Sequence, residues 1–80
     1  MFSQVERDHV VLAAQLIDAE GVPPRRQARN HNVRVNGKEY PPKYLMSKAC
    51  YFATGSEPGV WDTHSLDAIA RLEELGFTVS

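Results

Sequence analysis

Positively charged side chains are concentrated in one stretch of the sequence, residues 25–48, which we call the basic segment. Glu39 is the single carboxylate within it, against seven of the chain's nine cations: Arg25, Arg26, Arg29, Arg34, Lys38, Lys43 and Lys48. Arginine offers a planar set of donors to phosphate oxygens or a guanine edge, and clustered cations attract anionic partners. A solvated face that only keeps the domain soluble would have the same composition, so that alternative stays open.

Residue types that support catalysis or metal binding are scattered along the chain. Cys50 falls in the middle of an expected helix, which favours a buried thiol over a reactive one. His9, His31 and His64 lack the spacing of metal ligands. The sequence also has no nucleophile–base pattern and no glycine-rich phosphate loop. We therefore expect no catalytic centre, no metal, no cofactor and no small-molecule substrate.

Length and composition indicate one small globular domain over residues 1–80. The chain is 42% hydrophobic and 24% charged, with a net charge of −1. A chain of this length buries about 60% of its unfolded surface, so the core is small. No apolar run is long enough for a membrane span, the first residues lack a signal-peptide pattern, and a lone cysteine excludes an internal disulfide. We expect a cytoplasmic protein that does not bind membranes.

The elements that would position the cations begin with a β-hairpin. Val33 and Val35 alternate with Arg34 as in a half-buried strand, and Asn36-Gly37 favours a type I′ turn because both residues tolerate positive φ. A two-residue turn fixes the register. It predicts three facing pairs: Val33 with Tyr40, Arg34 with Glu39, and Val35 with Lys38.

Two helices are expected on either side of the hairpin. The first extends from about Gln4 to Glu20, with Ser3 and Glu6 at the spacing of a capping box and Leu12 in its apolar stripe. The second extends from about Pro42 to Thr54. Because it is apolar over much of its circumference, we expect it to lie centrally.

A third helix and a short strand complete the expected fold. The helix runs from about His64 to Leu75, with Leu66 on its buried face. Gly76 and Phe77 are typical of a Schellman ending. Residues 77–79 then add a strand to the hairpin sheet. The prediction is an α+β domain in the order helix, β-hairpin, helix, helix, short strand.

The basic segment combines cations, a tight turn and the start of a helix. Its turn can present Asn36 and Lys38 to a DNA groove, and the free N–H groups after Pro41-Pro42 can hold a phosphate. Tyr40 can stack on a base, although packing against Val33 is the competing role. The predicted DNA-binding residues are Arg25, Arg26, Arg29, Asn36, Lys38, Tyr40, Lys43 and Ser47.

Residues 36–44, with the sequence NGKEYPPKY, together with the closing Leu75-Gly76-Phe77, resemble the N-terminal head domain of McrA-like HNH restriction endonucleases. That family cuts DNA carrying methylated cytosine or a phosphorothioate backbone, through a separate HNH domain that has no counterpart in this sequence. The resemblance implies DNA-binding roles at Asn36, Lys38, Tyr40 and Lys43. The family's glycine pair before the last helix is replaced here by Asp62-Thr63 after Trp61.

Together these observations predict a non-catalytic module that binds double-stranded DNA. The resemblance implies that it is an accessory recognition domain of a modification-dependent restriction system, that its DNA is modified, and that nuclease domains of a parent protein are partners in cis. The alternative is a protein-interaction or dimerisation module of a larger protein. In that case the basic segment would meet an acidic partner, with Trp61 as an anchor.

Overall fold

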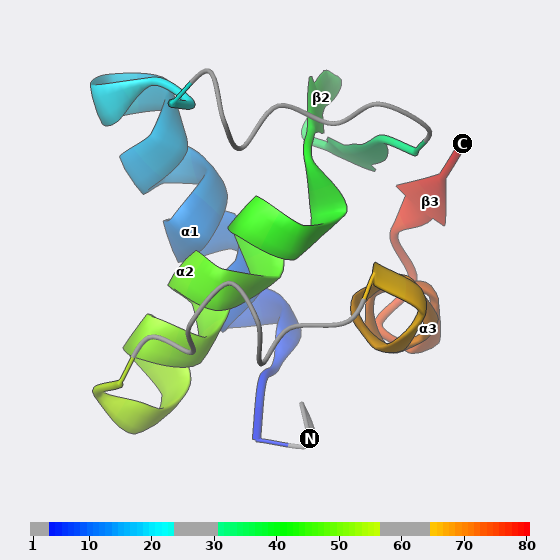
Figure 1. The fold of residues 1–80 in the computed structure, drawn as a ribbon. Helices are drawn as coiled ribbons and strands as arrows, with labels where there is room; N and C mark the ends of the chain where they lie inside the picture. The colour runs from blue at the N-terminus through cyan, green and yellow to red at the C-terminus, as the bar shows by residue number, and fades with distance from the viewer. Residues whose placement is uncertain (1–3, 24–30, 57–64) are drawn as a thin grey trace.

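The computed structural model describes residues 4–23, 31–56 and 65–80. Within them the chain forms α1 (Arg7–Glu20), β1 (Val33–Val35), β2 (Lys38–Tyr40), α2 (Pro42–Thr54), α3 (Ser65–Glu74) and β3 (Thr78–Val79). This order confirms the predicted α+β domain (Figure 1). None of the helices in these three ranges has both the length and the apolar character that crossing a membrane requires.

The three strands form one antiparallel sheet in the order β2-β1-β3. The hairpin register is the predicted one, because Val33 faces Tyr40 and the other two pairs follow. Asn36 and Gly37 have φ angles of 53° and 84°, as a type I′ turn requires. β3 joins the opposite side of β1, where Val33 faces Val79. The predicted addition of a C-terminal strand to the hairpin is therefore confirmed.

Helix α2 lies at the centre of the fold, as predicted, and its bounds match the sequence expectation. It packs against both α1 and α3 (Figure 1). Four consecutive side chains are buried: Tyr44, Leu45, Met46 and Ser47. Because successive helical residues point about 100° apart, this turn of α2 is enclosed on every side. The last helical residue is Thr54, and the C-cap is Gly55, whose φ is 82°.

The buried faces of α1 and α3 are narrower than predicted. On α1 the buried residues are Val10, Ala13, Ala14 and Ile17. Leu12 is 43% exposed and Leu66 is 77% exposed, so their expected places in the core were wrong. Each lies two positions, or about 200° around the helix, from a fully buried residue of the same helix, Val10 or Ala68. Both therefore point away from α2.

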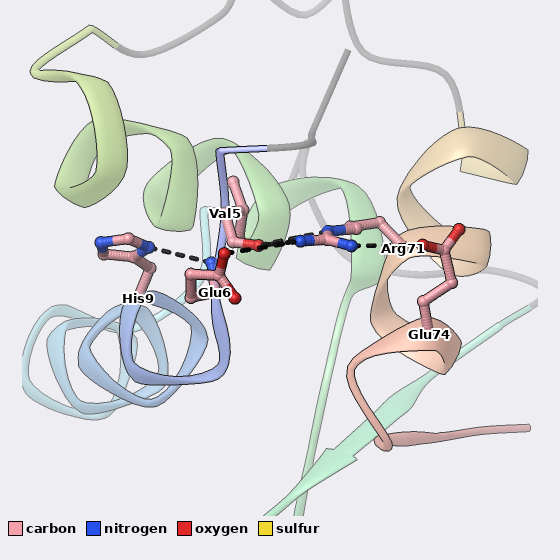
Figure 2. Close-up of polar contacts among 5 residues, drawn as sticks. All are labelled: Val5, Glu6, His9, Arg71 and Glu74. Carbon is pink, nitrogen blue, oxygen red and sulfur yellow. Dashed lines mark hydrogen bonds and ion pairs between the residues drawn. The ribbon is translucent and has the colours of Figure 1, made fainter.

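The N-terminal residues are held against α3 by Arg71 (Figure 2). Its Nη2 and Nε donate to the carbonyl oxygen of Val5 at 2.8 and 3.2 Å. The guanidinium also forms ion pairs with Glu6 at 3.9 Å and with Glu74 at 3.2 Å. The side chain of Val5 is 1% exposed. Arg71 thus fixes an extended segment whose valine contributes to the core.

Helix α1 begins at Arg7, three residues later than predicted, and its N-cap is Glu6. The predicted capping box starting at Ser3 is therefore wrong. The N–H of Glu6 donates instead to Nδ1 of His9 at 2.9 Å (Figure 2). The extended backbone at the N-cap Glu6 follows Val5, whose side chain is buried and whose carbonyl accepts from Arg71.

Helix α3 ends in the predicted Schellman motif. The N–H of Phe77 donates to the carbonyl of Leu72, and the N–H of Gly76 donates to that of Glu73, both at 3.0 Å. Gly76 has a φ of 92°. The guanidinium of Arg7 lies over the Phe77 ring, 4.4 Å from its centroid. This turn therefore carries the chain from α3 into β3 and packs it against the start of α1.

Replacing Gly76 with alanine should reduce the free energy of unfolding by more than the same change at Gly55. Positive φ costs an alanine about 1–2 kcal/mol at either position. At Gly76 a Cβ would also lie 2.9 Å from Nη1 of Arg7, so the guanidinium would have to move away from the Leu75 carbonyl to which it donates. At Gly55 a Cβ meets nothing within 4 Å. Denaturant unfolding of both variants measures the difference. Equal losses of unfolding free energy in the two variants would mean that the Arg7 guanidinium moves away from Gly76 without cost.

Replacing Arg71 with methionine should reduce the free energy of unfolding by about 2 kcal/mol, because charge-assisted hydrogen bonds to Val5 are lost. Glu74→Gln is the matched control. It removes one of the two exposed ion-pair partners of Arg71 but keeps the bonds to Val5, and should cost less than about 1 kcal/mol. Denaturant unfolding tests both variants. A loss in Glu74→Gln as large as in Arg71→Met would contradict the role given to Val5.

Candidate nucleic-acid interface

The structure separates the eight predicted DNA-binding residues into three groups. Arg25, Arg26 and Arg29 lie outside the described residues. Asn36 and Lys38 are exposed, and Lys43 is half-buried. Tyr40 and Ser47 are buried. Of the predicted DNA-binding cations, the structure therefore describes Lys38 on the hairpin and Lys43 at the start of α2.

The hairpin turn presents a polar, solvent-exposed tip. Asn36, Gly37 and Lys38 are all exposed. Nζ of Lys38 lies 3.5 Å from a carboxylate oxygen of Asp18 on α1, and the lysine side chain is 66% exposed. An ion pair this exposed contributes only about 0–1 kcal/mol. Lys38 can therefore exchange Asp18 for a phosphate at little cost.

Arg34 lies on the outward face of the sheet, beside the turn. It is exposed, and in the register it stands opposite Glu39, which is exposed too. Opposite charges in facing positions attract modestly across a strand pair. Glu39 is therefore the carboxylate that competes most directly with an anionic ligand for Arg34.

Tyr40 does not belong to the accessible surface, which corrects the prediction that it contacts DNA. Its ring is 4% exposed and faces Val33, the competing role named from the sequence. Its hydroxyl donates to Oδ1 of Asp18 at 2.8 Å. Burial, and then the hydrogen bond to Asp18, raises the pKa of Tyr40 to about 12. The tyrosine thus ties β2 to α1.

Ser47 is also removed from the predicted surface, because its exposed fraction is 0%. Its place on the early turns of α2 suggested access, but α1 and α3 pack around that part of the helix. The cap residue Pro41 supplies no side-chain acceptor, and both Pro41 and Pro42 are buried. Lys43, half-buried at the second helical position, is the charged group nearest to the helix start.

Three further residues on α2 share a surface that the site prediction missed. Lys48 is half-buried, and its Nζ lies 5.4 Å from the centroid of the Tyr44 ring. Tyr51 and Phe52 are 50% and 37% exposed. Their ring centroids are 5.6 Å apart with an interplanar angle of 72°. The i, i+3 and i, i+4 spacing from Lys48 is the sequence signal that could have found this face.

Cations and carboxylates are segregated among the described residues. Between residues 31 and 56, Glu39 alone opposes Arg34, Lys38, Lys43 and Lys48. Arg7 and Arg71, outside that range, both donate to backbone carbonyls and so serve the fold. This arrangement can attract and hold phosphate groups over the hairpin and α2.

Metal-ligand clusters and the single thiol are the other features of the described residues that bear on chemistry. No group of three or more histidine, cysteine, aspartate or glutamate residues among them could hold a metal ion. Burial raises the pKa of Cys50, which is 8% exposed, so its thiol stays protonated at neutral pH. This agrees with the core role expected from its position in the sequence.

The stability of the domain should decrease as the pH rises from 10 to about 12. The unfolded chain loses the Tyr40 proton near the ordinary pKa of 10.0, whereas the folded chain keeps it to about 12, so alkali favours unfolding in that range. Below pH 10 this contribution is constant. Denaturant unfolding across the range should show a smaller decrease for Tyr40→Phe than for the unchanged chain. Equal decreases would contradict the assignment.

Asp18→Asn provides a second test of the same pair. The amide removes the negative charge but leaves the ring buried, so the pKa of Tyr40 should fall and still exceed 10.0. An absorbance titration of the phenol measures this directly.

Comparison of the chain with protein-family models, with curated proteins and with solved structures finds no match.

Proposed function

We propose that this domain is a non-catalytic module that binds double-stranded DNA through its basic segment. The observation that carries the proposal is the segregation of charge. The cations of the hairpin and α2 are exposed or half-buried, Glu39 is the one carboxylate in the same range, and Asp18 of α1 lies beside Lys38. The arginines elsewhere in the described residues donate to backbone carbonyls. Such a surface fits a regularly spaced polyanion.

The interaction depends mainly on phosphate contacts, which position a protein on DNA without reading its sequence. Arg34 and Lys38 lie beside the hairpin turn, and Lys43 lies at the start of α2, three residues after the end of β2. Asn36 at the tip is the candidate for a contact inside a groove. Arg25, Arg26 and Arg29 would extend this surface.

The proposal extends to a cellular setting. The motif at residues 36–44 and the ending at residues 75–77 resemble the head domain of modification-dependent restriction endonucleases, so we propose an accessory DNA-recognition role in such a system. The nuclease would be a separate HNH domain of a parent protein, and the location would be the cytoplasm. Modified DNA is then the preferred ligand to test.

A protein-interaction module is the competing proposal. The exposure of Leu66, at 77%, favours it. Singly exposed apolar residues occur on most soluble proteins, however, and carry no preference for a partner. Trp61, the anchor named from the sequence, lies outside the described residues. The charge segregation is the reason we propose DNA in preference to a protein partner.

Removing charge at the facing pair Arg34 and Glu39 should change DNA affinity in opposite directions. Arg34→Gln should weaken binding to a short duplex, and the slope of log K against log salt should become shallower by about 0.9 if one phosphate contact is lost. Glu39→Gln should tighten binding, because Arg34 loses its facing carboxylate. Fluorescence anisotropy at several salt concentrations measures both effects.

Glu73→Gln is the matched control, since Glu73 is exposed on α3 outside the basic segment. It removes the same charge as Glu39→Gln and should change the affinity much less. Equal effects of the two glutamate variants would mean that net charge alone governs binding. Absence of binding to every duplex at low salt would refute the proposal.

A further inference from the structure

The C-terminal half of α2 carries a half-buried lysine and two exposed aromatic rings at the spacing of one helix face. Lys48 precedes Tyr51 by three residues and Phe52 by four, a spacing that puts the three residues on one side of the helix. The Nζ of Lys48 lies toward the N-terminus from the pair, 5.4 Å from the centroid of the Tyr44 ring. Tyr51 is 50% exposed and Phe52 is 37% exposed. The helix is enclosed around Tyr44 to Ser47 but open here, so the core does not account for these rings.

The two rings meet at an interplanar angle of 72° with their centroids 5.6 Å apart. In such an edge-to-face pair, the edge of one ring meets the face of the other. Each ring therefore keeps at least one face that its neighbour does not cover. A flat ligand can stack on such an uncovered face. In a parallel stacked pair the two rings would cover one face of each other.

We infer that this face of α2, formed by Lys48, Tyr51 and Phe52, stacks an unpaired nucleobase while Lys48 contacts the adjoining phosphate; this inference rests on the proposed DNA-binding function. Aromatic rings beside a cation are the usual platform for unstacked bases, because every base has a π-face. Base pairing in an intact duplex hides those faces, so the ligand is DNA with an unpaired position.

Charge at the two ends of the helix supports a nucleotide over an acidic peptide as the occupant. The C-terminal end of a helix carries partial negative charge, which disfavours an anion beside Tyr51 and Phe52. A neutral base suits that end, and its phosphate suits Lys48, one turn nearer the N-terminus.

The test compares three DNA probes of the same sequence: a fully paired duplex, the duplex with one unpaired base, and the single strand. The domain should bind the probes with an unpaired base more tightly than the paired duplex. Tyr51→Ala and Phe52→Ala should remove this preference, each by about 5- to 150-fold, while paired-duplex binding stays nearly unchanged. Tyr51→Phe should keep the preference, because the ring remains.

Leu12→Ala is the matched control, since Leu12 is 43% exposed on a different helix. It should bind all three probes like the unchanged chain. Circular dichroism of each variant should confirm that the fold is intact, as expected for exposed positions.

The outcomes distinguish this inference from the function on which it rests. Salt-dependent binding to the paired duplex without a preference for the unpaired base would overturn the inference alone. Failure of all three probes to bind at low salt would overturn both. Loss of self-association in Tyr51→Ala or Phe52→Ala, measured by sedimentation and without a change in DNA binding, would assign the face to a second copy and overturn the inference.

Discussion

The enclosure of α2 is the constraint on which the rest of the molecule depends. So short a chain can form only a small core, and α2 contributes to it in several directions because α1 and α3 pack on it together. Pro41 and Pro42 connect the hairpin directly to the enclosed part of the helix and are buried with it. The hairpin is thereby held close to the core, and the hydrogen bond from Tyr40 to Asp18 fastens its second strand to α1.

The cations of the described residues fall into two groups: those that bind backbone carbonyls and those that remain at the surface. Arg7 and Arg71 lie where chain ends and turns must be held, and both guanidinium groups bind backbone carbonyls. Lys38 and Arg34 extend from a hairpin whose two strands pair with each other and do not need these side chains as partners. They remain at the surface, where a ligand can reach them. The charge balance of the whole chain, −1, conceals this division.

Local chemistry explains which features could be predicted from the sequence. The Asn36-Gly37 turn determines the hairpin register, and Gly76 determines the ending of α3, because both depend on φ preferences of adjacent residues. The start of α1 could not be predicted, since it depends on Arg71, more than sixty residues away. The burial of Ser47 and the exposure of Leu12 likewise depend on which helices pack against which face. Of the candidate site, the cations were found from composition and the aromatic face was missed.

The most direct test of DNA binding is an amide-shift NMR titration of the domain with a short duplex, unmodified and then methylated, at two salt concentrations. The account predicts shifts that weaken with salt and are concentrated in the hairpin and the first turn of α2, around Arg34, Lys38 and Lys43. Absence of shifts at low salt and excess DNA would contradict it. So would salt-sensitive shifts confined to α1 and α3, because the acidic part of the chain would then be the interface.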